Sequence, residues 1–258
     1  MNIASRSSIG QSDSICQRPA PGGSPPRPFF PFYGSKWRIA RLYPPPSGPV
    51  IEPFAGSAGY SVYFGVRRVL LLDVDPIIVG VWDYLINASQ LEILALPMLQ
   101  PGECVSHLKV SQEARWLIGF WINRGSSTPR NTLTQFSART EKSQLVWSQK
   151  AKERIARQQH YIRHWEVRHG SFEEAPDLGA TWFIDQPYTT KGRYYRFHDI
   201  DYAALAEWVR TRSGLVIACD NPAATYLPFE SLVNAKSTKG FAQEGIYVTG
   251  RDSARRLH

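Results

Sequence analysis

The sequence contains little cysteine: among 258 residues there are only three, Cys16, Cys104 and Cys219. They share no metal-ligand spacing and are too few for a disulfide framework, so we expect a protein of a reducing compartment. No apolar run approaches the roughly 20 residues that a helix needs to cross a bilayer, and the N-terminal segment lacks the apolar stretch of a secretory signal. These absences predict a cytoplasmic protein that does not contact membranes.

Acidic residues are also scarce, with 22 Asp and Glu against 30 Lys and Arg, which gives a net charge of +8. The excess is concentrated in residues 100–170, which carry twelve basic and five acidic residues. A basic segment inside a slightly acidic body is typical of a surface that contacts a polyanion. A solvated helix face would produce the same pattern, because much of the charge lies on residues 142–165.

Apolar runs alternate with helical patterns along most of the chain. Hydrophobic residues make up 43% of the sequence, which is enough to build a core. We expect buried strands and helices in the order 50–54 (strand), 69–74 (strand), 76–89 (helix), 181–185 (strand), 202–212 (helix) and 215–220 (strand). Strands separated by helices predict a mostly parallel sheet that is covered on both faces.

Composition divides the chain into three parts. Residues 1–28 are rich in Ser, Pro and Gly and are expected to form a disordered tail. Residues 29–99 and 171–258 carry the strand–helix alternation, whereas residues 100–170 form an insert with a polar loop between helical stretches at about 112–123 and 142–165. The predicted fold is therefore α/β with a basic, mainly helical insert.

A small-residue turn, EPFAGSAG at 52–59, follows the first expected strand. Small residues there allow a ligand to approach the backbone, although ordinary strand–helix turns are also rich in glycine. Asp73 ends the second strand about twenty residues later, where a carboxylate can accept hydrogen bonds from ribose hydroxyls. The alternative role for Asp73 is to cap the next helix, but Asp75 suits the cap better, with Pro76 in the first turn.

Two further motifs flank this region. The tetrapeptide Asp185-Gln186-Pro187-Tyr188 follows an apolar strand and offers an acceptor side chain, a main-chain carbonyl and an aromatic face. Such a set suits a planar base that bears an amino group, although strand-end turns also favour Asp and Pro. The segment FYGSK at 32–36 is either a packing turn or a cover for a cofactor.

The order of these motifs resembles that of the D12-class (Dam-type) DNA adenine N6-methyltransferases, which use S-adenosylmethionine. That family has an aromatic-Gly-x-Lys turn, a P-F-x-G-x-G-type loop, an L-x-D-x-N segment, a target-recognition insert and D-P-P-Y. This chain has FYGSK at 32–36, EPFAGSAG at 52–59, LLDVDP at 71–76, the basic insert and DQPY at 185–188. The resemblance covers roughly residues 29–250. It implies a Rossmann-like class I methyltransferase sheet and site-specific methylation of adenine in DNA, either alone or within a restriction–modification system.

The resemblance also implies roles for single residues. Asp185 and the main-chain carbonyl of Gln186 would accept the two N–H bonds of the target amine, and Tyr188, after Pro187, would stack on the base. Asp73 would bind the ribose of the cofactor. The other implied cofactor contacts are Tyr33, Lys36, Glu52, Pro53, Phe54, Gly56, Ser57, Gly59 and Phe172. Tyr194 and Tyr195 are expected to lie in the core rather than at the base.

The chain departs from the family pattern at three positions. Gln186 replaces the first proline of D-P-P-Y; it keeps a main-chain carbonyl but loses the rigidity of proline. We expect activity to be retained, in altered form at most, and inactivation is the rival interpretation. Asp75-Pro76 replaces the usual Asn-containing pair, and Ser171 stands where an acid is common.

The insert is expected to bind DNA mainly through phosphates, using Lys150, Arg154 and Arg157. Arg124, Arg130 and Asn131, in or beside the polar loop, are expected to read bases, because Arg and Asn present bidentate groups. The target adenine would have to be flipped out of the duplex or lie in a single strand. A monomer is favoured.

Three alternatives remain open on the sequence. One keeps the methyl donor but changes the acceptor to cytosine N4, RNA or a protein amide; Asp185 in place of Ser favours adenine. A second is a DNA-binding protein that has the fold without catalysis. A third, a nicotinamide-dependent enzyme, is disfavoured because G-x-G-x-x-G is missing.

Overall fold

The structure is a computed structural model that describes residues 24–122, 125–134, 146–190, 192–237 and 240–249. A seven-stranded sheet of order β3-β2-β1-β4-β5-β7-β6 forms its centre. The strands are β1 Val50–Glu52, β2 Val69–Asp73, β3 Glu166–His169, β4 Ala180–Ile184, β5 Gly214–Asp220, β6 Glu230–Ser237 and β7 Gly240–Thr249. Strands β3, β2, β1, β4 and β5 are parallel, while β7 runs antiparallel to β5 and β6. The expected α/β class with a mostly parallel sheet is confirmed.

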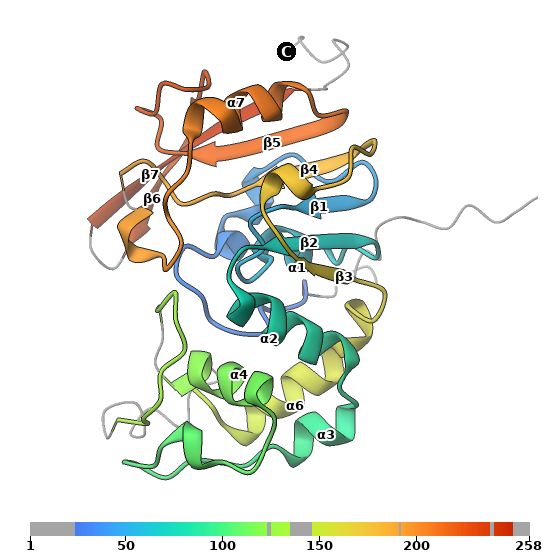
Figure 1. Cartoon of the computed structure of the whole chain (residues 1–258), viewed down its shortest axis with the longest axis vertical. Coiled ribbons are helices and arrows are strands. Elements are labelled where there is room, and N and C mark those ends of the chain that lie inside the picture. The colour runs from blue at the N-terminus through green and yellow to red at the C-terminus, as the bar shows by residue number, and fades with distance from the viewer. Residues whose placement is uncertain (1–23, 123–124, 135–145, 191, 238–239, 250–258) are drawn as a thin grey trace, which may run out of the picture.

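Helices cover both faces of this sheet. Successive residues of a strand point to opposite faces, so each strand contributes side chains to two separate core clusters. Val50, Leu71 and Phe183 belong to one core cluster, which also contains residues of the insert helices. Their neighbours Ile51, Leu72 and Trp182 belong to a second cluster that packs on α7. The α-helices are α1 Gly59–Phe64, α2 Pro76–Asn87, α3 Gln90–Ala95, α4 Gln112–Ile122, α6 Gln149–Gln158 and α7 Tyr202–Arg210. Figure 1 shows α7 beside β5 at one end of the molecule and α3, α4 and α6 at the other.

Helix α2 begins as the sequence predicts. The Asp75 side chain accepts a hydrogen bond from the main-chain N–H of Ile77 at 3.0 Å, and Pro76 occupies the first turn. Both features stabilise a helix start, because the cap satisfies one free N–H and proline needs none there. Asp75 is therefore the cap, and Asp73 is left to interact elsewhere.

The insert differs from its prediction in its C-terminal part. Helices α4 and α6 fall within the expected helical stretches, but α6 is shorter, and residues 135–145 lie outside the described residues. Glu166–His169 within the segment 100–170 forms β3 and pairs with β2, so the sheet resumes before residue 171. Strands β3, β6 and β7 were not predicted, since β3 and β6 are mostly polar and the apolar run of β7 is confined to residues 246–248.

A continuous core joins the insert to the sheet through the segment that precedes β1. The Trp121 indole on α4 donates a hydrogen bond to the Phe29 carbonyl at 2.9 Å. The Phe30 ring lies 5.5 Å from Trp82 on α2 and 5.1 Å from Phe120 on α4, between centroids. Residues 1–23 of the expected tail lie outside the described residues, whereas Arg27 hydrogen-bonds with Gln158 through its main chain.

Candidate active site

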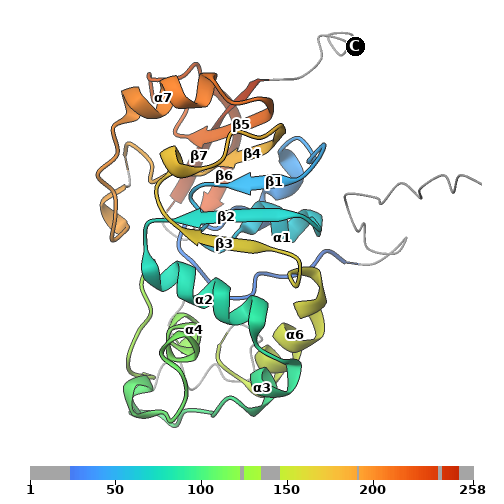
Figure 2. The ribbon, with the colours of Figure 1, turned by 45° about the vertical axis from the view of Figure 1, so that its right-hand side comes forward.

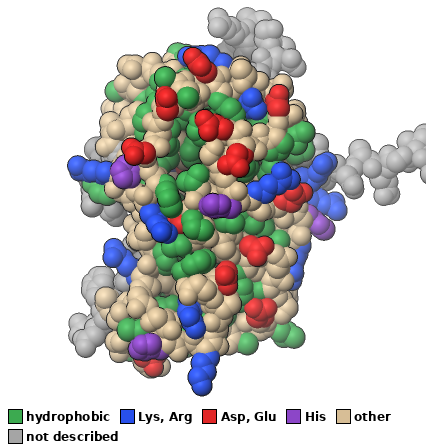
Figure 3. Space-filling view, viewed as in Figure 1, with side chains coloured by type: hydrophobic (Ala, Val, Ile, Leu, Met, Phe, Trp, Pro, Cys, Tyr) green, Lys and Arg blue, Asp and Glu red, His purple; other side chains and the backbone are tan. Residues whose placement is uncertain are grey.

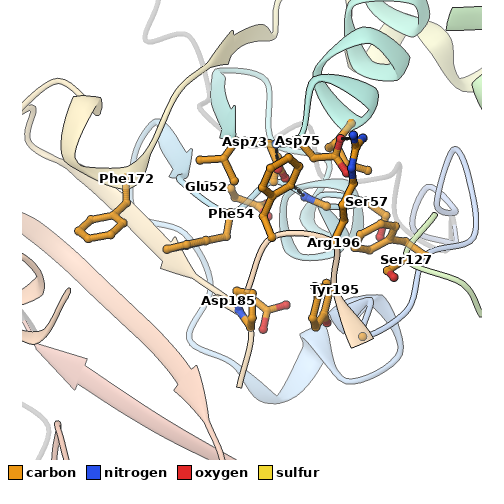
Figure 4. A pocket seen from close by; sticks show the side chains of 18 of the residues that line it. Glu52, Phe54, Ser57, Asp73, Asp75, Ser127, Phe172, Asp185, Tyr195 and Arg196 are labelled. Carbon is orange, nitrogen blue, oxygen red and sulfur yellow. Dashed lines mark hydrogen bonds and ion pairs between the residues drawn. The ribbon is translucent and has the colours of Figure 1, made fainter. Parts of the chain in front are cut away.

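A pocket of about 300 Å³ opens where the strand order reverses. From β1 the chain goes on to β2 and β3 on one side of the sheet and returns to β4 and β5 on the other, so β1 and β4 are neighbours. In open α/β sheets ligands bind at the carboxyl ends of the strands at this point. Figure 4 shows Asp73 and Asp75 on one side of the pocket and Asp185 and Tyr195 on the other.

The glycine turn after β1 lines the pocket and is held by Asp73. Gly56 has φ +44°, and its main-chain N–H donates to Asp73 Oδ2 at 3.0 Å. A Cβ at Gly56 would lie 3.0 Å from the Phe32 ring, so both the backbone angle and the space favour glycine. Gly59 is tied to packing as well, because a Cβ there would lie 2.7 Å from the main-chain nitrogen of Trp37.

Asp73 presents its carboxylate to the pocket while two main-chain donors hold it. Besides Gly56, the Asp75 N–H donates to Asp73 Oδ1 at 2.9 Å. Burial raises the pKa of Asp73 to about 6, and the two N–H donors oppose this rise. The carboxylate is therefore oriented, mostly ionised at neutral pH and available to donors of a ligand.

Another part of the pocket wall combines a buried acid with two stacked aromatic rings. Glu52, 2% exposed, accepts a hydrogen bond from the Ser61 N–H at 2.9 Å, and burial raises its pKa to about 8. The rings of Phe54 and Phe172 stack with centroids 5.7 Å apart. Pro53, the next residue after Glu52, is buried and does not line the pocket. The wall thus offers one neutral acid and an aromatic surface.

Asp185 lies directly after β4 and forms an ion pair with Lys36. The Lys36 Nζ lies 2.6 Å from Asp185 Oδ1, donates to the Gly34 carbonyl at 3.0 Å and lies 4.8 Å from the centre of the Tyr188 ring. Burial alone would lower the pKa of Lys36, but the nearby carboxylates of Asp185 and Glu244 raise it. Burial raises the pKa of Asp185 to about 6, against the effect of Lys36. Lys36, predicted as a cofactor contact, thus holds the predicted catalytic carboxylate.

The other three residues of the tetrapeptide are held by hydrogen bonds to neighbouring segments. Tyr188 Oη donates to Glu244 Oε1 at 2.5 Å, and burial raises the pKa of Tyr188. Pro187 lines the pocket, and its carbonyl accepts from Tyr202 Oη at 2.8 Å. The Gln186 side chain is buried toward β5 and does not line the pocket. Tyr188, predicted to stack on the base, does not line the pocket either.

The mouth of the pocket contains residues that no sequence motif marks as site residues. Ser127, from the loop of the insert, lines the pocket, and its hydroxyl donates to the Tyr194 carbonyl. Arg196 also lines it and pairs with Asp75 at 3.4 Å. The expectation that Tyr194 and Tyr195 are core residues is wrong, because Tyr194 is 45% exposed and Tyr195 lines the pocket. Only the tertiary structure brings these segments together.

The predicted DNA contacts in the polar loop have different surroundings. Arg124 lies outside the described residues. Arg130 is exposed, whereas the Asn131 side-chain oxygen accepts from the Ser106 N–H at 3.0 Å and so serves the loop itself. Neither Arg130 nor Asn131 lines the pocket.

The predicted phosphate contacts on α6 lie away from the pocket. Lys150 and Arg157 are exposed, but the Arg154 guanidinium packs 4.9 Å from the centre of the Trp121 ring and donates to the Pro28 carbonyl at 3.4 Å. Figure 2 shows α6 on the side of the amino ends of β2 and β3, whereas the pocket opens at the carboxyl ends. On the face of Figure 3 basic and acidic side chains are interspersed.

Most of the predicted cofactor contacts therefore share one pocket with Asp185. Of that predicted set, only Pro53 does not line it; the members that do are Tyr33, Lys36, Glu52, Phe54, Gly56, Ser57, Gly59, Asp73 and Phe172.

Within the described part of the chain, no helix has the length and apolar character needed to cross a bilayer. In comparisons with known proteins, no family model matches the chain. The curated proteins contain no match to it either.

Proposed function

We propose that this protein is an S-adenosylmethionine-dependent DNA methyltransferase that acts on the N6 amine of adenine, built on a Rossmann-like class I methyltransferase sheet. One observation carries the proposal: Asp185, the glycine turn and Asp73 line the same pocket at the switch point of the sheet. Asp185 is more than a hundred residues from the other two segments, and each of the three matches a different motif of the D12-class pattern. Their meeting supports a site where a nucleobase amine and a nucleoside-containing cofactor come together.

The residues of the pocket fit S-adenosylmethionine chemically. The Asp73 carboxylate, fixed by two N–H donors, would accept hydrogen bonds from the ribose hydroxyls. The stacked rings of Phe54 and Phe172 would contact the adenine, and the glycine turn would admit the methionine part close to the backbone. When bound, the cofactor supplies an electrophilic methyl group.

The target amine needs help because its lone pair is delocalised into the purine ring. Asp185 would accept one of its N–H groups and the Gln186 carbonyl the other, and both would return electron density to the nitrogen, so that catalysis is largely orientation and electrostatics. Gln186 itself does not line the pocket, so the amine would have to reach its carbonyl between the lining residues Asp185 and Pro187. The proton that the nitrogen loses after methylation would pass to the Asp185 carboxylate. Lys36 already occupies Asp185 Oδ1, so the incoming amine must displace this ammonium or use Oδ2.

A base inside a duplex cannot reach a recessed pocket, so we expect the target adenine to be extruded or single-stranded. The mouth of the pocket suits an unstacked strand, since Tyr194 and Phe197 are 45% and 43% exposed. Arg193 lies 5.3 Å from the centre of the Tyr194 ring, and Arg196 lies 5.2 Å from that of Phe197. Exposed aromatics beside arginines can stack on bases and contact phosphates.

The test is methylation of DNA by the purified protein, followed by single-molecule mapping of modified bases. Asp185→Asn should reduce kcat by about 10²–10³-fold, because it removes the charged acceptor at the reacting nitrogen. The matched control is Asp177→Asn, since Asp177 is an exposed carboxylate that pairs with Arg212 at 3.5 Å outside the pocket. Equal methylation by the Asp185→Asn variant and the wild type would refute the assigned role.

The second candidate is a protein that binds the cofactor and DNA without methyl transfer. Two observations favour it: the Lys36 ammonium holds the Asp185 carboxylate, and Gln186 interrupts the family tetrapeptide. Binding of labelled S-adenosylmethionine with no label transferred to DNA would support this candidate. Label found in N6-methyladenine would exclude it.

A further inference from the structure

The Gln186 side chain ties the tetrapeptide to the end of β5. Its Nε2 lies 2.7 Å from the Cys219 carbonyl, 3.2 Å from Asp220 Oδ2 and 2.6 Å from Tyr226 Oη. The two N–H bonds of the amide are therefore shared among three acceptors. Gln186 is only 1% exposed, so water does not compete for these bonds.

Asp220 anchors the same turn a second time. This buried carboxylate accepts hydrogen bonds from the hydroxyl of Thr189 at 3.3 Å and from that of Tyr226 at 2.9 Å. Gln186 and Thr189 stand on either side of Pro187-Tyr188, so both ends of the short turn are attached to one residue of β5. The turn is thus restrained by side-chain hydrogen bonds, which is a different kind of restraint from the ring of a proline at 186.

One atom of the Gln186 side chain lowers the stability of the fold, which indicates that the hydrogen bonds of its N–H groups are needed to hold the turn. Gln186 Oε1 is buried and has no hydrogen-bond partner among the described residues. A buried acceptor without a partner destabilises a fold, and an apolar side chain of similar size would avoid that cost. If the side chain at position 186 only filled space, leucine there would therefore give a more stable protein than glutamine.

We propose that the Gln186 side chain is a positioning device that fixes the main-chain carbonyl of the same residue, as the proline ring does in D-P-P-Y. Proline restricts the backbone through its φ angle. Gln186 restricts it through a buried side chain with three fixed partners. The inference rests on the proposed function, in which that carbonyl accepts a hydrogen bond from the target amine; Gln186 acts on the reaction only through this carbonyl.

The decisive comparison uses Gln186→Leu, which removes the hydrogen bonds, and Gln186→Pro, which restores rigidity by another means. We expect Leu to lower kcat at least tenfold with S-adenosylmethionine affinity within twofold of the wild type. We expect Pro to keep kcat within threefold of the wild type. Gln159→Leu is the matched control, because Gln159 of the insert is fully buried and its amide donates to the carbonyls of Leu85 and Ala88 at the end of α2, away from the pocket; its kcat should not change.

Amide hydrogen exchange gives a readout that does not depend on activity. Exchange in a peptide covering residues 185–190 should be faster in Gln186→Leu than in the wild type, and slow again in Gln186→Pro. Tyr226→Phe, which removes one partner of Nε2, should show a smaller increase and serves if the Leu variant does not fold.

Two results would overturn the inference. One is a Leu variant with wild-type kcat and wild-type exchange. The other is an equal loss of kcat in the Leu and Pro variants, because the amide itself rather than backbone rigidity would then be required. If the wild type methylates no DNA, the proposed function fails, and the exchange comparison alone decides whether Gln186 rigidifies the turn.

Discussion

Two carboxylates of the pocket, Asp73 and Asp185, have pKa values that burial raises to about 6. Both lie at the carboxyl ends of apolar strands, a location at which the sequence alone predicts ligand contacts. Glu244 and Ser127 could not be predicted in the same way. Each comes from a segment without a recognisable motif. Glu244 contacts Tyr188 and Ser127 contacts Tyr194, and in both pairs the two residues are more than fifty positions apart in the chain.

The pKa of Asp73 predicts how cofactor binding depends on pH. Hydroxyl donors need the ionised carboxylate, so the contribution of Asp73 to S-adenosylmethionine affinity should be complete above pH 7 and should be lost as pH drops through about 6. If the protonated form does not bind, the fall is about tenfold per pH unit. Calorimetric titration between pH 5 and 8 measures this. Asp73→Asn should bind weakly at every pH, and a flat wild-type profile would contradict the assignment.

At the scale of elements, the strands with almost continuously apolar sequences were predicted and the other three were not. Strands β1, β2, β4 and β5 are buried between two helical layers, so their sequences are almost continuously apolar. Strand β3, with the sequence EVRH, lies at the edge of the sheet and is mostly exposed. Strand β7 still contributes Glu244 to the support of Tyr188, so an element without a sequence signal positions one with a strong signal.

Glu244 predicts a stability effect. Its Oε1 accepts hydrogen bonds from Tyr43 at 2.6 Å and from Tyr188 at 2.5 Å, and the residue is 6% exposed. Glu244→Leu leaves two phenol groups without this acceptor, which should cost about 2–6 kcal/mol of unfolding free energy. Urea unfolding measures the loss.

A double-mutant background gives the control for Glu244. In a Tyr43→Phe, Tyr188→Phe protein the hydroxyls are already absent, so the same Glu244→Leu change should cost much less. An equal cost in both backgrounds would show that the hydrogen bonds do not stabilise the fold.

At the scale of the whole molecule, the insert and the sheet share one hydrophobic cluster. This cluster includes Phe29 from the segment before β1, Trp82 from α2, Trp121 from α4 and Ile155 from α6. The composition of the chain divides residues 29–99, 100–170 and 171–258 by charge, but charge does not report where apolar side chains meet. A continuous core predicts that these parts unfold together.

A single unfolding transition is therefore expected. Circular dichroism, tryptophan fluorescence and loss of cofactor binding should have the same midpoint in urea. Trp121→Ala should destabilise the protein by about 3–5 kcal/mol and shift all three midpoints together. Separate midpoints, with cofactor binding unaffected by Trp121→Ala, would mean that the insert unfolds independently.

The salt dependence of DNA affinity tests where the duplex lies. If α6 contacts phosphates, replacing Lys150 and Arg157 by alanine should reduce the slope of log affinity against log salt by about 2. Arg154→Ala should instead reduce stability, because its guanidinium packs on Trp121. The comparison pair is Arg193→Ala with Arg196→Ala at the pocket mouth. A change of slope in that pair alone would place the phosphate backbone along the mouth and away from α6.

The pairing of Tyr43 with Glu244 joins positions 201 residues apart. During synthesis the aromatic and lysine residues of the N-terminal segment leave the ribosome long before the strand that completes their surroundings. Lys36 is synthesised well before its ion-pair partner Asp185, and Tyr188 is synthesised before its hydrogen-bond partner Glu244. A nascent chain that ends before β7 therefore has every sequence motif of the pocket but lacks the carboxylate that supports Tyr188, and the surroundings of the pocket are complete only after β7 has been synthesised.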